Sequence, residues 1–222
     1  MRLWSILPAV AALAILSGCG GDGKQEISAE PPAANPSIVA QQAAETITAR
    51  YQRDLKAAVL AAMNAGGAVY AITVCESKAP EIAAVHGNEG AWTITRVSDS
   101  PRVPSHMADA HQLEVLQKFA DTVSPMTYYT EWITVPTGDS TFVYYEAIRI
   151  GEICTNCHGN RDKLAQGVPE RLAELYPKDN ALGYEVGDLR GMFVVTMNWP
   201  EALAPAQELI KPTSQEPAAE AK

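Results

Sequence analysis

The sequence predicts an α+β domain built on a small antiparallel sheet with flanking helices. Two β-rich segments flank a turn signal in the second half of the chain, and a long helical pattern comes before them. Strands and helices do not alternate regularly, so a parallel sheet of βαβ units is not expected. The chain has 222 residues, of which 47% are hydrophobic, and this fits one medium globular domain with tails.

The first predicted element is a long helix. Ser37 is a suitable N-cap, and the helix is expected to end at Gly66-Gly67. The alanine-rich segment 69–85 follows, in which Pro80 predicts two short helices or a kinked one. The apolar residues of the first helix recur with roughly helical spacing at Ile47, Tyr51, Leu55, Val59 and Ala62.

The second half of the chain carries the strand signals. Segments 127–135 and 141–150 are rich in Tyr, Thr, Ile and Val, and Pro136-Thr137-Gly138-Asp139 between them favours a hairpin turn. The other expected elements are a strand over 91–97, a helix that Asp109 caps and that runs through Ala120, a helix over 164–176 and a strand over 191–199.

The amino terminus predicts an export signal. Met1 and Arg2 precede an apolar run over 3–16, which has the length of a signal-peptide core and is short for a membrane span. The run ends in Leu16-Ser17-Gly18-Cys19, which resembles the lipobox of bacterial lipoproteins. This resemblance implies cleavage before Cys19 and diacylation of its sulfur, and two acyl chains suffice for stable anchoring. The alternative is ordinary secretion with Cys19 lost or left free.

These patterns divide the chain into four parts. They are a signal peptide over 1–18, a flexible tether over 19–36, a folded domain over 37–204 and a disordered tail over 205–222. Gly20 follows the cysteine where an aspartate would favour inner-membrane retention, so we expect a periplasm-facing anchor in the outer membrane. No later segment is expected to span a bilayer.

The charge of the chain argues against nucleic acid as a partner. Acidic residues number 26 and basic residues 17, for a formal net charge of -9. No cluster of Lys and Arg is present that could neutralise several phosphates in a row.

Cys154-Thr155-Asn156-Cys157-His158 has the spacing of the c-type haem attachment motif. In such a motif two thiols bind the haem vinyl groups, and the adjoining imidazole reaches the iron. A zinc site is disfavoured because no second Cys-x-x-Cys or His-x-x-x-His pair is present. A thioredoxin-like redox pair would normally open a helix after a strand in a βαβ unit. One covalently attached haem is therefore the predicted cofactor.

Cys75 is left without an obvious role. If Cys19 is lipidated and Cys154 and Cys157 hold haem, Cys75 has no disulfide partner in an oxidising compartment. It is either an inert buried cysteine or the second axial ligand of the iron, whose sixth position could also stay open to a small gas. The other candidates for that position are His86, His106, His111, Met63, Met107, Met126, Met192 and Met197.

Several short stretches form a distinctive set. They are 71–75 with Ala79-Pro80, Pro101-Arg102-Val103-Pro104, 154–159, Tyr176-Pro177-Lys178-Asp179 and 183–191. Through them the region 45–198 resembles a bacterial and cyanobacterial family of single c-type-haem domains of unknown function. The resemblance implies a PAS-like fold and an iron held by His158 and Cys75. Where that family often has Pro-Arg-Asn-Pro, this chain has Val103 in place of the asparagine.

Arg102, Arg190 and Tyr184 are further candidates for cofactor binding. Guanidinium groups match carboxylates in a bidentate way, so either arginine could pair with a haem propionate. Either could instead tie a loop to Asp99 or Asp188. Tyr184 could cover a haem edge, or it could belong to a purely structural turn.

Three functional hypotheses follow from these residues. The first is electron transfer at low potential by a lipid-anchored periplasmic haem protein with a separate redox partner. The second is a redox or gas sensor that signals to another protein. The third is a peroxidase, which would need a distal acid or base such as His106 or His111. No organic substrate is expected for the first two.

Overall fold

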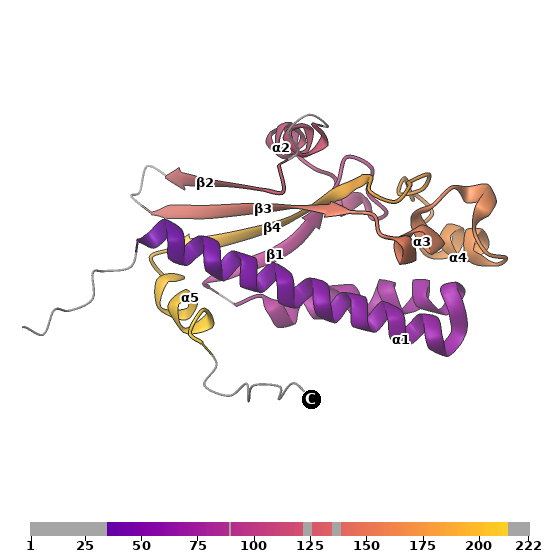
Figure 1. Ribbon diagram of the computed structural model, residues 1–222, viewed down its shortest axis with the longest axis horizontal. Coiled ribbons are helices and arrows are strands. Elements are labelled where there is room, and N and C mark those ends of the chain that lie inside the picture. Colours follow the sequence, from indigo (N-terminus) through magenta and orange to yellow (C-terminus); the bar gives the residue numbers. More distant parts are fainter. Residues whose placement is uncertain (1–34, 89, 122–125, 135–138, 213–222) are drawn as a thin grey trace, which may run out of the picture. The chain divides into compact units, whose positions relative to one another are not determined.

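The computed structural model describes residues 35–88, 90–121, 126–134 and 139–212. It contains a four-stranded antiparallel sheet with helices on both faces (Figure 1). The predicted α+β class, the antiparallel sheet and the long N-terminal helix are therefore confirmed. The PAS-like assignment stays a prediction, and the export signal, Cys19 and most of the tether lie outside the described residues.

The sheet has the strand order β1-β4-β3-β2. Its strands are β1 (Trp92–Val97), β2 (Tyr128–Thr134), β3 (Ser140–Arg149) and β4 (Leu189–Trp199). Thr134 pairs with Ser140, which confirms the hairpin of β2 and β3, although most of its turn signal lies outside the described residues. Because all pairs are antiparallel, β1 and β3 end where β4 begins.

Helix α1 (Pro36–His86) is interrupted where the sequence predicts its end. Gly66 and Gly67 leave helical geometry, and Gly67 has a φ of 70°, which favours glycine. The chain reverses there and returns antiparallel to its first limb (Figure 1). The N-cap is Asn35 rather than Ser37, since the Asn35 side chain accepts a hydrogen bond from the Ser37 amide at 3.0 Å.

The returning limb of α1 is one continuous helix, so Pro80 does not divide it as we expected. Among the described residues, α1 is also a helix long and apolar enough to cross a membrane by length and composition. We expected no such segment after the signal. The reversal at Gly66-Gly67 instead makes α1 a hairpin whose two limbs pack in the domain.

Both faces of the sheet are covered. Phe142 and Tyr144 of β3 point to a core shared with α1 and α5, while Val143 and Tyr145 point to a core shared with α2. This alternation follows from the two-residue period of a strand. Figure 1 shows α2 on one side of the sheet and α1 with α5 on the other.

The remaining helices are short. They are α2 (Ala110–Ala120), α3 (Thr155–His158), α4 (Val168–Leu175) and α5 (Leu203–Leu209), with 3₁₀ turns at Pro104–His106, Glu152–Cys154 and Arg161–Lys163. Asp109 and Gln112 form the capping box that starts α2. The packed chain extends past 205, where we expected the tail, because Ala206 of α5 is completely buried in the core beside α1.

Candidate functional site

The Cys-x-x-Cys-His motif lies in a short helical turn at one end of the sheet, between β3 and α4. The 3₁₀ turn that contains Cys154 leads directly into α3, which contains Cys157 and ends at His158. Both cysteines are half-buried and have free thiols. A side chain at Gly159 would place its Cβ 2.5 Å from the carbonyl oxygen of Thr155, so the end of α3 requires glycine.

The imidazole of His158 is oriented through its Nδ1 atom. This atom lies 2.8 Å from the carbonyl oxygen of Ala181, which can only accept a hydrogen bond, so Nδ1 carries the proton. Burial lowers the pKa of His158 well below its usual value, and the nearby charges of Arg102 and Arg190 lower it further. The ring is therefore neutral, with Nε2 unprotonated. Among the described residues, the polar contacts of this ring lie at Nδ1, where Ala181 accepts the hydrogen bond.

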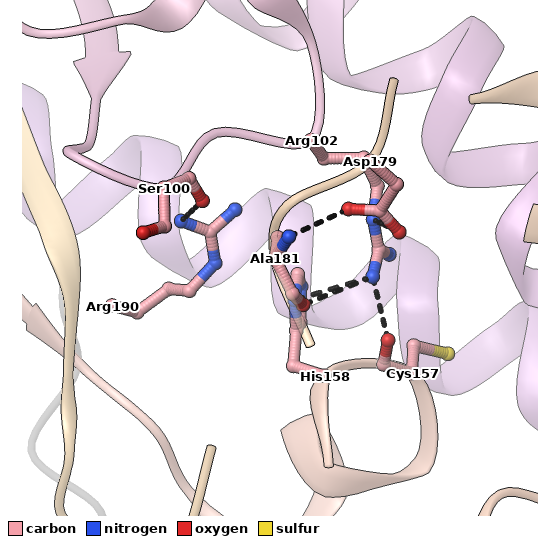
Figure 2. A network of polar contacts seen from close by, with 7 residues as sticks. All are labelled: Ser100, Arg102, Cys157, His158, Asp179, Ala181 and Arg190. Carbon is pink, nitrogen blue, oxygen red and sulfur yellow. Dashed lines mark hydrogen bonds and ion pairs between the residues drawn. The ribbon is translucent and has the colours of Figure 1, made fainter. Parts of the chain in front are cut away.

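Arg102 joins the motif to the segment that carries Ala181 (Figure 2). Its Nε donates to the Asp179 carboxylate at 3.1 Å, and its Nη2 donates to the Cys157 carbonyl at 2.6 Å. Asp179 in turn accepts from the Ala181 amide at 2.8 Å. Arg102 therefore positions the carbonyl that orients His158, and its carboxylate partner is Asp179 rather than Asp99 or Asp188.

The returning limb of α1 brings Cys75 to this end of the molecule. Ile72 of that limb packs in one cluster with Leu172 of α4, and both Cys157 and Met63 pack against the cluster. Cys75 is half-buried, and burial raises the pKa of its thiol, while the nearby charges of Arg96 and Arg102 lower it. Burial raises the pKa of Cys157 most, and the charge of Cys75 raises it further. The fold thus gathers Cys75, Cys157 and Arg102 in one neighbourhood.

Arg190, at the start of β4, extends the site on the side of Tyr184. Its Nη1 donates to the Ser98 hydroxyl at 2.9 Å and to the Ser100 carbonyl at 3.3 Å. Its Nε is buried and has no hydrogen-bond partner among the residues that the structure describes. The guanidinium lies 5.5 Å from the ring centre of Tyr184, and that ring makes an edge contact with the imidazole of His158.

Arg96 belongs to the same neighbourhood, and we did not predict it as a site residue from the sequence. Its charge acts on Cys75, on His158 and on Arg190. The signal was present, because Arg96 follows Trp92 and Ile94 at two-residue spacing and so shares the buried face of β1. A charged residue at the spacing of the buried residues of a strand is expected to need a partner for its charge.

The other candidates for the sixth iron position lie in different surroundings. Met63 packs beside the motif, and His106 is close enough to Arg96 and Arg190 for their charges to lower its pKa, although burial lowers it most. Of the other candidates, His86 contacts Asp54, His111 contacts Glu131, Met192 and Met197 are completely buried, and Met107 and Met126 are exposed.

A shallow hollow of about 190 Å³ borders the site at Tyr176 and Asp179. Its lining does not include Cys154, Cys157 or His158. The chemistry of the site therefore rests on its side chains rather than on this hollow.

Two comparisons with known proteins point to the same protein family. A family model described as Tll0287-like matches residues 25–198. The crystal structure of the cyanobacterial heme-protein Tll0287 matches with a TM-score of 0.50 and 24% sequence identity, over 75% of this chain and 98% of that chain. At that identity the similarity concerns the fold. No curated protein sequence matches this chain.

Proposed function

Because the chain belongs to the Tll0287-like family, we propose that it binds one haem, held covalently by Cys154 and Cys157 and ligated by His158. One observation carries this proposal. The imidazole of His158 is neutral and held through Nδ1, which leaves the unprotonated Nε2 as the atom that can ligate iron. A heme protein with the same fold supports it.

The surrounding residues fit this cofactor. The thiols of Cys154 and Cys157 are free and half-buried, which suits bond formation with vinyl groups. The buried Nε of Arg190 has no partner in the described chain, and a carboxylate such as a propionate would satisfy it. The ring of Tyr184 makes an edge contact with the imidazole of His158, where it could cover one edge of the haem.

We propose Cys75 as the second axial ligand. The fold places it on a limb that packs beside the motif. Burial raises the pKa of its thiol, and the positive charges of Arg96 and Arg102 partly offset that rise. A thiolate ligand stabilises ferric iron and lowers its reduction potential. Met63 is the strongest rival, since it packs in the same cluster as Cys157.

The function that we propose is electron transfer at low potential. Haem supplies one-electron redox chemistry when it is bound. The Ala181 carbonyl is the neutral acceptor of the hydrogen bond from His158 Nδ1, and Arg102 donates a second hydrogen bond to the same carbonyl. We propose further that Cys19 is lipidated and anchors the domain facing the periplasm, where a separate protein exchanges electrons with it. Loss of the protein from the membrane fraction in Cys19→Ser tests the anchor.

Spectroscopy of the purified protein tests the cofactor and its ligands. We expect a pyridine haemochrome spectrum typical of haem with two thioether bonds, and a low-spin ferric signal typical of thiolate in paramagnetic resonance. That signal should vanish in Cys75→Ala and persist in Met63→Leu, with Met107→Leu as the control. A signal unchanged in Cys75→Ala would remove this residue from the iron.

The same preparation separates the alternative functions. Rapid electron exchange without ligand uptake would support the carrier. Binding of carbon monoxide or nitric oxide by the ferrous protein would favour a sensor, and turnover of peroxide that depends on His106 would favour a peroxidase.

A further inference from the structure

Three guanidinium groups near His158 share one carboxylate. Arg102 lies 3.3 Å from His158 Nδ1 through its Nη2, and Arg190 lies over the ring of Tyr184, which contacts His158. Arg96 stands on β1 two residues before Ser98, whose hydroxyl accepts a hydrogen bond from Arg190. Within the described residues, only Arg102 has a carboxylate within ion-pair distance, namely Asp179. In the described part of the chain, the other two cations thus have no carboxylate within ion-pair distance.

Arg190 has donors on one side that the described part of the chain does not use. Its Nη1 is engaged by Ser98 and Ser100, while its buried Nε has no partner. In guanidinium, Nε and Nη2 form the side that binds both oxygens of one carboxylate in parallel. In the part of the chain that the structure describes, no hydrogen bond engages this side. Burial lowers the pKa of Arg190, and the charges of Arg102 and Arg96 lower it further, so an anion here would relieve an existing repulsion.

Arg96 is similarly free of acidic partners in the described part of the chain. Its guanidinium lies 5.7 Å from the ring centre of Tyr51, which is buried. It projects from the same face of β1 as Trp92 and Ile94. An aromatic ring supports the charge but does not satisfy the donors of the guanidinium.

Arg102 is occupied on the corresponding side. Its Nε binds Asp179, and its Nη2 binds the carbonyl oxygens of Cys157 and, at 3.4 Å, Ala181. In Figure 2 it lies on the side of His158 opposite to Arg190. The prediction that Arg102 meets a propionate has not been tested, but these bonds favour a positioning role for it.

We infer that Arg96 and Arg190 form a binding site for a ligand with two separate carboxylates, and, resting on the proposed function, that these are the two haem propionates. The positive charges of Arg96 and Arg190, which have no carboxylate within ion-pair distance in the described residues, would be balanced by the negative charges of the two propionates. Arg102 stays paired with Asp179 and holds the motif.

Resonance Raman spectroscopy of the haem-loaded protein tests this assignment. The bending mode of a propionate shifts when its hydrogen bonds to a guanidinium are lost. We expect Arg96→Lys to shift one propionate band and Arg190→Lys to shift the other, because lysine keeps the charge but loses the bidentate contact. The variant that carries both substitutions should shift both bands. Arg50→Lys, on an exposed position of α1, is the matched control.

The outcomes separate this inference from the proposed function. Absence of a haemochrome in the unaltered protein would refute the proposed function itself. Covalent haem with unshifted propionate bands in Arg96→Lys and Arg190→Lys would overturn only the inference. A band shifted by Arg102→Lys but not by Arg96→Lys would also overturn it and assign that propionate to Arg102. If a lysine variant yields no folded protein, Arg96→Gln and Arg190→Gln give the same test.

Discussion

Replacement of Asp179 by asparagine should destabilise the folded protein strongly for a single isosteric change. The ion pair between Arg102 and Asp179 is mostly buried, with side-chain exposures of 13% and 7%. In Asp179→Asn the amide oxygen can still accept from the Ala181 amide, so that hydrogen bond is retained. The substitution removes the charge and also replaces the oxygen that accepts from Arg102 Nε by an amide NH₂ group, which leaves the Arg102 cation buried and unpaired.

The size of the effect follows from this burial. Removal of one partner of a buried ion pair costs about 3–5 kcal/mol, and Arg102 keeps two carbonyl acceptors, so we expect the lower end, about 3 kcal/mol. For a domain of this size that free energy corresponds to a fall in Tm of roughly 6–12 °C. A surface pair offers the control: Glu174→Gln, which breaks an exposed pair with Arg171, should cost less than about 1 kcal/mol.

Thermal unfolding followed by circular dichroism measures this effect, and a double-mutant cycle identifies its cause. Arg102→Gln combined with Asp179→Asn removes both charges, so the double variant should be less destabilised than the two single variants added together. A Tm of Asp179→Asn within about 1 °C of the unaltered protein would refute the reasoning, since a buried unpaired cation cannot be so inexpensive. Strict additivity in the cycle would show that the two side chains do not interact.

Three further predictions concern other parts of the molecule. Gly159→Ala should lower stability by roughly 1–3 kcal/mol and reduce the yield of covalent haem, because its Cβ would lie 2.5 Å from the Thr155 carbonyl oxygen. Phe119→Ala, in the core beside α2, should cost about 3–5 kcal/mol in urea unfolding and leave the haem spectrum unchanged. Burial lowers the pKa of His106, so its contribution to stability is full above the unfolded value and is lost as the pH falls. His106→Gln should therefore flatten the decline of the urea midpoint below about pH 6.5.

Each of these predictions has a matched control. Gly151→Ala adds a methyl group whose nearest neighbour is 3.9 Å away, so an equal loss of haem in both glycine variants would contradict the steric argument. Leu113→Ala, partly exposed on α2, should cost much less than Phe119→Ala. For His106, a steep acidic decline that persists in the glutamine variant would show that another group causes it.

Much of the fold could be predicted because its signals are local. The hairpin of β2 and β3 and the reversal at Gly66-Gly67 depend on residues adjacent in the chain. The continuation of the helix through Pro80, in place of two short helices, could not be predicted from the local preference of proline alone. Helix α5 was missed for a similar reason: Ala206 is buried only because α1 and the sheet lie against it.

The site shows the same division. The motif residues are contiguous and could be recognised as a motif from the sequence, whereas Arg96 acquires its position only when β1 and β4 pair. The partner of Arg102 was also beyond the sequence, because Asp99 is near it in the chain and Asp179 is near it only in space. A charge without an acidic partner, such as that of Arg96, can be recognised only when the neighbours of the residue in space are known.

The position of β4 has a consequence for the order in which the protein can be completed. The last strand of the chain lies inside the sheet, between β1 and β3, so its pairing with β1 joins residues about a hundred positions apart. In the order of the sequence, the β2–β3 hairpin and the Cys-x-x-Cys-His motif precede β4, so β1 has no neighbour in the sheet until β4 pairs with it. Arg96 and Arg190 are brought together last. The surroundings of the motif are therefore completed only when the last strand of the chain has paired.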